Sequence, residues 1–169
     1  MSNNLSFFHN NIVPLTNKQK RKLKRVNTGL RLREIEPMTK TQERVFNSYY
    51  SGKNIMCHGA AGTGKTFIAT YLATQEVLSN YNDTRSLHII RSVVPTRDMG
   101  FLPGNQREKS KVYEAPYYAI FSELFERGDA YEILKGREQV YFTTTSFIRG
   151  LTINDACLLY TSPSPRDGI

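Results

Sequence analysis

The sequence is poor in residues that cross-link small folds or bind metals, and it has no long hydrophobic run. Its two cysteines, Cys57 and Cys157, give neither a metal-binding spacing nor a disulfide framework. The three histidines, His9, His58 and His88, are scattered, which argues against a catalytic or metal-binding triad. The lack of a long apolar run gives no indication of a membrane span or a signal peptide. We therefore expect a cytoplasmic protein in a reducing compartment, with Cys57 buried in a strand.

Acidic residues are absent from the first 33 positions, which hold eight of the 23 lysines and arginines. The rest of the chain has 15 basic and 15 acidic residues, so the formal net charge of +8 comes from this N-terminal segment. We expect residues 1–35 to form a basic, flexible arm. Such an arm suits salt-sensitive contacts with nucleic-acid phosphates, although it can also be a solubilising tail. The candidate contact residues are Lys20, Arg21, Lys22, Lys24 and Arg25.

A glycine-rich motif matches the pattern G-x-x-x-x-G-K-[ST] at every fixed position. It consists of Gly59, Ala60, Ala61, Gly62, Thr63, Gly64, Lys65 and Thr66. Glycines let the backbone curl around a phosphate, and the N–H groups of such a loop form an anion-binding nest. In this pattern Lys65 reaches the β- and γ-phosphates, and the Thr66 hydroxyl binds Mg²⁺. The motif therefore predicts binding of ATP and Mg²⁺, with Lys65 and Thr66 as the catalytic residues.

The flanks of the motif support this interpretation, because a phosphate-binding loop works between a strand and a helix. Residues 54–58 are mostly apolar, as in a buried strand, and residues 67–78 have helical spacing without Gly or Pro. The other expected elements are strands at residues 87–90 and 140–144, a helix over residues 116–127 that opens with a proline, and a Gly- and Pro-rich loop over residues 96–104. Alternating strands and helices favour an α/β fold with a mostly parallel sheet.

Four stretches, taken together and in this order, resemble the PhoH-like family of P-loop ATPases. They are residues 39–42, the 59–66 loop, residues 97–104 with their Gly-Phe-Leu-Pro-Gly element, and residues 147–156 with Arg-Gly-x-Thr and Asn-Asp-Ala. Many families share the phosphate loop, whereas the last two elements are far more specific. The resemblance covers residues 36–156, and the compact form is similar to the phage version.

The resemblance implies a RecA-like core that hydrolyses ATP in a bacterial or phage-infected cell. It also implies a homo-oligomeric ring and a helicase-like action on RNA or another nucleic acid. Gln42 matches the glutamine with which helicase-like ATPases recognise the adenine edge, since an amide both donates and accepts. The alternative for Gln42 is an ordinary surface residue of a helix. Arg149 matches the Arg-Gly element, where it would contact nucleic acid, sense the γ-phosphate or brace the fold.

The sequence departs from the family pattern after Ala156. The family continues there as an apolar strand that ends in Asp-Glu-Ala-Gln, whose acids position magnesium and activate the attacking water. Here Thr161 and Ser162 stand where the acids should be, and a Ser/Pro-rich segment follows. We expect residues 157–169 to be a tail from a truncated gene or a natural short variant, after a partial ATPase core over residues 36–156. Such a chain should bind ATP weakly, hydrolyse it very poorly and expose an open sheet edge.

Two other functions stay open on the sequence alone. A small-molecule or nucleotide kinase also uses a phosphate loop, but it needs an acceptor pocket and an arginine-rich lid, and neither is clear in this chain. A non-catalytic protein would bind ATP as a structural ligand and would bind nucleic acid through its basic arm.

Overall fold

The computed structural model describes residues 29–79, 84–92, 106–148 and 150–162. The chain divides into two compact units, Met1–Arg31 and Leu32–Ile169. Every helix and strand below belongs to the second unit. The Gly- and Pro-rich loop expected at residues 96–104 lies outside the described residues.

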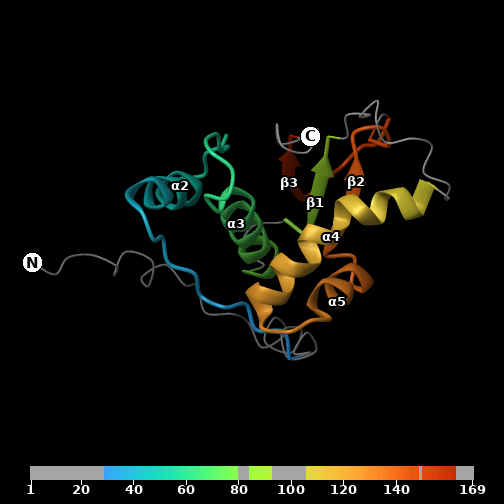
Figure 1. Cartoon of the computed structure of the whole chain (residues 1–169), viewed down its shortest axis with the longest axis horizontal. Coiled ribbons are helices and arrows are strands. Elements are labelled where there is room, and N and C mark those ends of the chain that lie inside the picture. Colours follow the sequence, from blue (N-terminus) through green and yellow to red (C-terminus); the bar gives the residue numbers. More distant parts are fainter. Residues whose placement is uncertain (1–28, 80–83, 93–105, 149, 163–169) are drawn as a thin grey trace, which may run out of the picture. The chain divides into compact units, whose positions relative to one another are not determined.

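In the described residues of the second unit, a pair of helices precedes β1, a second pair precedes β2, and β3 follows β2 (Figure 1). The elements are α2 (Lys40–Tyr50), α3 (Lys65–Ser79), β1 (Ser86–Arg91), α4 (Gln106–Phe125), α5 (Ala130–Gly136), β2 (Val140–Thr144) and β3 (Ala156–Thr161). The two strands expected at residues 87–90 and 140–144 are confirmed as β1 and β2. None of the described helices is both long enough and apolar enough to cross a membrane.

The described strands form one sheet in the order β2-β1-β3, and both pairings are parallel. In the register of the sheet, Leu87 of β1 stands between Val140 of β2 and Cys157 of β3. Parallel neighbours require crossover connections, and α4 and α5 supply the one between β1 and β2. Helix α3 packs against β1 and β3, and α5 packs against β2. The expected α/β fold with a parallel sheet is therefore confirmed.

The core lies between one face of the sheet and the helices. Leu87 and Ile89 of β1 are completely buried, as are Phe121 and Leu124 of α4 and Tyr131 of α5. Alternate residues of each strand point to the opposite face of the sheet. Three large side chains are exposed there, namely Tyr141, Leu158 and Tyr160.

The strand expected at residues 54–58, directly before the phosphate loop, is wrong. The structure gives this segment no strand, Met56 is 91% exposed, and Cys57 is exposed rather than buried. An apolar pentapeptide becomes a strand only where a neighbouring strand bonds its backbone groups. In the described part of the chain, the sheet pairs β1, β2 and β3 with one another and gives residues 54–58 no such neighbour.

The start expected for the helix at residue 116 is also wrong. Helix α4 begins at Gln106 and carries Pro116 in its interior. A proline there removes a helical hydrogen bond and usually kinks the helix, and α4 changes direction near its middle (Figure 1). The helix persists because Tyr117, Phe121 and Leu124, spaced at i, i+4 and i+7, are buried on one side.

Strand β3 includes the first residues of the segment 157–169 that the sequence analysis described as a tail. Leu159, Tyr160 and Thr161 all pair with β1, and the backbone N–H of Ser92 donates to the Thr161 carbonyl oxygen at 2.9 Å. The strand therefore reaches Thr161, the first of the two positions at which the family pattern places its acids, and Ser162 follows directly after it.

Candidate functional site

The glycine-rich loop curls around the start of α3, as the motif predicts. Gly62 and Gly64 have φ angles of 77° and 78°, in the left-handed region that favours glycine. The N–H of Ile68 donates to the Gly64 carbonyl oxygen at 2.9 Å, which closes the first turn of α3. Helix α3 thus begins at Lys65, inside the motif and two residues before the helical stretch expected at residues 67–78, and residues 59–63 are exposed.

The side chain of Lys65 folds back into this curl. Its Nζ lies 2.5 Å from the Ala60 carbonyl oxygen, 3.1 Å from that of Gly59 and 3.3 Å from the Thr63 hydroxyl. The Thr63 hydroxyl in turn donates to the Ala60 carbonyl oxygen at 3.0 Å. The ammonium group therefore lies among the backbone oxygens of the loop. A phosphate oxygen that bound there would replace these protein oxygens as the partner of Lys65.

The first turn of α3 adds further groups suited to an anion. The leading N–H groups of a helix have no carbonyl partner within it, and the helix dipole places partial positive charge at this end. Thr66 lies in this turn with its side chain exposed. Glycines with positive φ, an inward ammonium and a helix N-terminus together fit the triphosphate of ATP.

Gln42 lies next to the loop, although it is distant in sequence. Thr39 caps α2 by accepting the Gln42 N–H at 3.2 Å, and the Gln42 Oε1 accepts the Met38 N–H at 2.7 Å. This reciprocal pattern resembles a capping box and fixes the amide group. Its Nε2 lies 3.8 Å from the position that a Cβ of Gly64 would take. The structure therefore brings Gln42 and the phosphate loop together.

The three strands end on one edge of the sheet, at Arg91, Thr144 and Thr161. In parallel sheets this carboxyl edge is where ligands bind. The Arg91 guanidinium lies 5.6 Å from the centre of the Tyr113 ring, and the hydroxyls of Tyr117 and Thr161 are 3.1 Å apart. Over the described ranges, no three His, Cys, Asp or Glu side chains are grouped so that they could hold a metal ion.

The structure also shows a polar cluster around Glu76 of α3, which the sequence analysis did not predict. The Tyr49 hydroxyl donates to Glu76 Oε2, Thr84 donates to Glu76 Oε1 at 3.0 Å, and Cys157 Sγ lies 3.7 Å from the Tyr49 oxygen. Burial, followed by the bond to Glu76, raises the pKa of Tyr49, and burial raises that of the Cys157 thiol. These residues come from four separate parts of the chain, so no local sequence pattern connects them.

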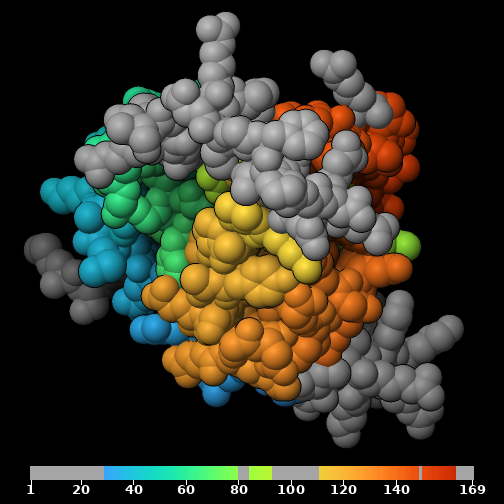
Figure 2. Space-filling model, turned by 45° about the vertical axis from the view of Figure 1, so that its right-hand side comes forward, coloured from blue at the N-terminus to red at the C-terminus, as the bar shows by residue number. Residues whose placement is uncertain are grey.

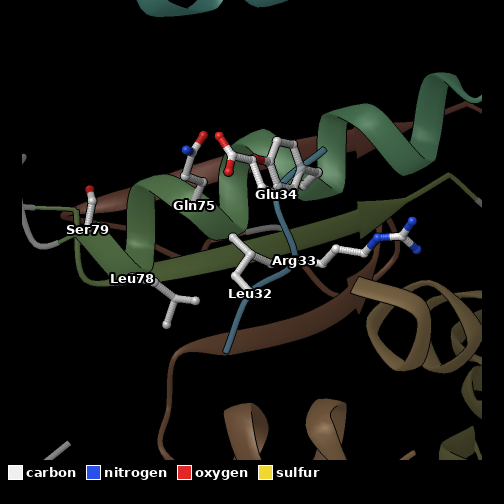
Figure 3. A pocket seen from close by; sticks show the side chains of 7 residues that line it. Leu32, Arg33, Glu34, Gln75, Leu78 and Ser79 are labelled. Carbon is white, nitrogen blue, oxygen red and sulfur yellow. The ribbon is translucent and has the colours of Figure 1, made fainter. Parts of the chain in front are cut away.

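A shallow pocket lies along the second half of α3 (Figure 3). It is lined by Leu32, Arg33, Glu34, Tyr71, Gln75, Leu78 and Ser79. The Gln75 side chain already accepts the Tyr50 hydroxyl at 2.8 Å. No residue of the phosphate loop lines the pocket, so it is distinct from the nucleotide site that the motif predicts.

The predicted nucleic-acid contacts lie outside the described residues. This applies to Lys20, Arg21, Lys22, Lys24, Arg25 and Arg149. The space-filling view accordingly shows the second unit with the parts of uncertain placement in grey (Figure 2).

Comparisons with known proteins agree with the loop geometry. Residues 34–160 match the family described as PhoH-like protein. A PhoH-like protein of Synechocystis sp. is 33% identical over 104 residues, which cover 61% of this chain and 31% of the relative. Protein PhoH2 of Bacillus subtilis is 34% identical over 107 residues, which cover 60% and 24%. A PhoH-like protein of Mycobacterium leprae is 27% identical over 125 residues, which cover 74% and 35%. The chain thus spans only about a quarter to a third of the length of these relatives.

Proposed function

The chain belongs to the PhoH-like family of P-loop ATPases, and from this membership we propose that it binds ATP with Mg²⁺ and acts on nucleic acid. The observation that carries the proposal is the position of the Lys65 ammonium, inside a glycine curl at the N-terminus of α3. ATP supplies the phosphoryl bond that is cleaved, and Mg²⁺ neutralises the charge that develops on the phosphates.

Each residue of the site has a separate task in this proposal. The backbone N–H groups of the loop and of the first turn of α3 bind the phosphates. Lys65 exchanges its contacts with Gly59 and Ala60 for the β- and γ-phosphates, and the Thr66 hydroxyl binds the metal ion. Gln42 Nε2 donates to an acceptor on the adenine edge. The Oε1 atom of Gln42 already accepts the Met38 N–H, which fixes the side of the amide that faces the ligand.

We infer that this chain hydrolyses ATP slowly. Thr161, the last residue of β3, and Ser162, which follows it, stand where the family pattern has two acids, and the Thr161 hydroxyl contacts that of Tyr117. Neither side chain can take a proton from water or offer a carboxylate to Mg²⁺. The double substitution Thr161→Asp and Ser162→Glu should raise Mg²⁺-dependent hydrolysis, as followed by phosphate release. An unchanged rate in the folded variant would contradict this explanation.

The finer parts of the proposal concern partners and location. We propose RNA as the favoured nucleic acid, a helicase-like use of ATP, and a ring of identical subunits in the cytoplasm of a bacterial or phage-infected cell. The support comes from the charge of residues 1–33 and from the family resemblance.

The direct test of ATP binding is the variant Lys65→Ala. Loss of a hydrogen bond to a charged group costs about 1.5–3 kcal/mol, so the Kd for Mg-ATP should rise about ten- to a hundredfold, as measured by calorimetry. The matched control is Lys53→Ala, which removes an exposed lysine outside the motif and should leave the Kd unchanged. RNA binding by the arm should survive in both variants. Equal ATP affinity in the wild type and Lys65→Ala would refute the proposed site.

A further inference from the structure

We propose that Tyr49 and Glu76 are positioning residues of the nucleotide site, because their hydrogen bond holds α2 in the orientation that places Gln42 beside the phosphate loop. The inference rests on the proposed function, since it concerns how the same site recognises the base of its nucleotide. It assigns a role to a pair of side chains that lie outside the glycine-rich motif.

Helix α2 carries Gln42 in its first turn and Tyr49 in its last, about 10 Å apart along the helix axis. Phe46 is the only residue of this fully described helix that is buried, and its ring lies 6.0 Å from that of Tyr71 on α3. With one buried residue in the middle of a short helix, the direction of α2 depends on the polar contacts near its ends. The bond from Tyr49 to Glu76 is the part-buried one of these contacts to α3, and through it the direction of α2 and the position of Gln42 are fixed.

Glu76 is itself well anchored. It lies on α3, the helix whose N-terminus forms the phosphate site, and its second carboxylate oxygen accepts the Thr84 hydroxyl at 3.0 Å. Helix α3 therefore provides both reference points, Gly64 and Lys65 at its start and Glu76 about 16 Å further along. The Gln42 end and the Tyr49 end of α2 are each set against this one rigid element.

The partly buried setting makes this bond stronger than its exposed equivalents. The Tyr49 oxygen lies close to Cys157 of β3 in a part-buried position, and burial raises the pKa of the phenol. A hydrogen bond to a carboxylate in such a setting is also costly to lose, because water replaces it poorly.

The neighbouring tyrosine provides a matched control. Tyr50 is also on α2, and its hydroxyl donates to Gln75 of α3 at 2.8 Å, but this bond lies at an exposed position. Tyr50→Phe thus removes the same atom from the same helix where water can replace the lost bond. We expect it to change nucleotide affinity less than about twofold.

The test compares two ligands on the full chain, Mg-ATP and inorganic tripolyphosphate with Mg²⁺, by calorimetry. Tyr49→Phe should weaken ATP binding about three- to tenfold and should change tripolyphosphate binding by less than about twofold, because only the contact to the base depends on α2. Gln42→Ala should show the same selectivity. In the Gln42→Ala background, Tyr49→Phe should have no further effect, since coupled residues are not additive. Glu76→Gln keeps an acceptor oxygen and should retain most of the affinity for ATP.

Several results would overturn the inference. One is a Tyr49→Phe variant that loses the same affinity for Mg-ATP and for tripolyphosphate. Another is additive effects of Tyr49→Phe and Gln42→Ala on ATP affinity. A third is an ATP affinity that Tyr49→Phe leaves unchanged while the wild type binds ATP. If Tyr49→Phe does not fold, Thr84→Val removes a different donor to Glu76 and should give the same selectivity with a smaller loss of affinity. A wild-type chain that binds neither ligand would refute the proposed function itself, and this separates the two failures.

Discussion

At the scale of single residues, the most buried charge in the described residues belongs to Glu114 of α4. Its side chain is 8% exposed, and Oε1 accepts both the Tyr131 hydroxyl and the Lys135 ammonium at 2.7 Å. Both donors come from α5, so the carboxylate joins the two helices. A buried carboxylate is tolerated only when it is paired and hydrogen-bonded, and here it has both kinds of partner.

Tyr131→Phe should destabilise the fold, because it removes one of the two donors and leaves the carboxylate in place. We expect the free energy of unfolding to fall by about 1.5–3 kcal/mol, as measured by urea denaturation. Tyr118→Phe is the control, since the Tyr118 hydroxyl donates to Glu132 at an exposed position, and it should change stability by less than about 0.5 kcal/mol. If the two variants lose the same free energy of unfolding, burial of Glu114 does not strengthen the contribution of its hydrogen bond to stability.

The same pair predicts how stability depends on alkaline pH. Burial, and then the bond to Glu114, raises the pKa of Tyr131 well above its ordinary value. A group with a raised pKa in the folded state adds stability below its unfolded pKa, near 10, and loses that stability as the pH rises toward the folded pKa. Above about pH 10 the unfolding free energy should fall by about 1.4 kcal/mol per pH unit for this tyrosine. Urea titrations at pH 8 and pH 11 should show a smaller fall in Tyr131→Phe, whereas equal falls would contradict the assignment.

At the scale of elements, β3 is the least protected part of the sheet. In the part of the chain that the structure describes, it pairs with β1 alone, and Leu158 and Tyr160 are each 58% exposed. An unpaired strand edge with apolar side chains is a template for association with another chain.

Leu158→Lys should therefore reduce self-association at high protein concentration, because a charge on an edge strand opposes strand pairing. Light scattering across a concentration series measures the effect, and stability should change by less than about 0.5 kcal/mol because the side chain is exposed. Val112→Lys adds the same charge to an exposed position of α4 and serves as the control. A similar reduction in both variants would indicate a general effect of net charge rather than of the strand.

The elements that were predicted correctly are those that a short stretch of sequence determines. The motif fixed the start of α3, and runs of apolar residues located β1 and β2. The failures have tertiary causes. Residues 54–58 have the composition of a strand but no bonding neighbour among the described strands, and Pro116 stays within α4 because the side chains around it are buried. In the site, the phosphate loop could be predicted from its spacing, whereas the contact from Tyr49 to Glu76 depends on how two helices meet.

At the scale of the whole molecule, positive charge is concentrated at one end of the sequence. Deleting residues 1–28 removes six of the eight basic residues that precede Glu34 and keeps Arg33, whose N–H donates to the Leu124 carbonyl oxygen of the second unit. We expect RNA affinity to fall and ATP affinity to stay the same. If all six side chains contact phosphates, the slope of log affinity against log salt should become shallower by about 4.

Fluorescence anisotropy with a single-stranded RNA at several salt concentrations gives this slope. Deleting residues 1–17, a segment with no lysine or arginine, is the matched control and should change neither affinity nor slope. RNA binding that survives the longer deletion unchanged would assign the interaction to the second unit instead.

The uneven distribution of charge bears on whether the exposed face of the sheet can associate with a second copy of the chain. Beyond residue 33 the basic and acidic residues balance, so the repulsion that keeps copies apart in solution comes from the first 33 residues. A polyanion that neutralises those residues would also remove the colloidal barrier, and Tyr141, Leu158 and Tyr160 would then be free to meet a second copy. We expect RNA, at a stoichiometry that just cancels the charge, to trigger condensation of the protein and, in excess, to dissolve it again.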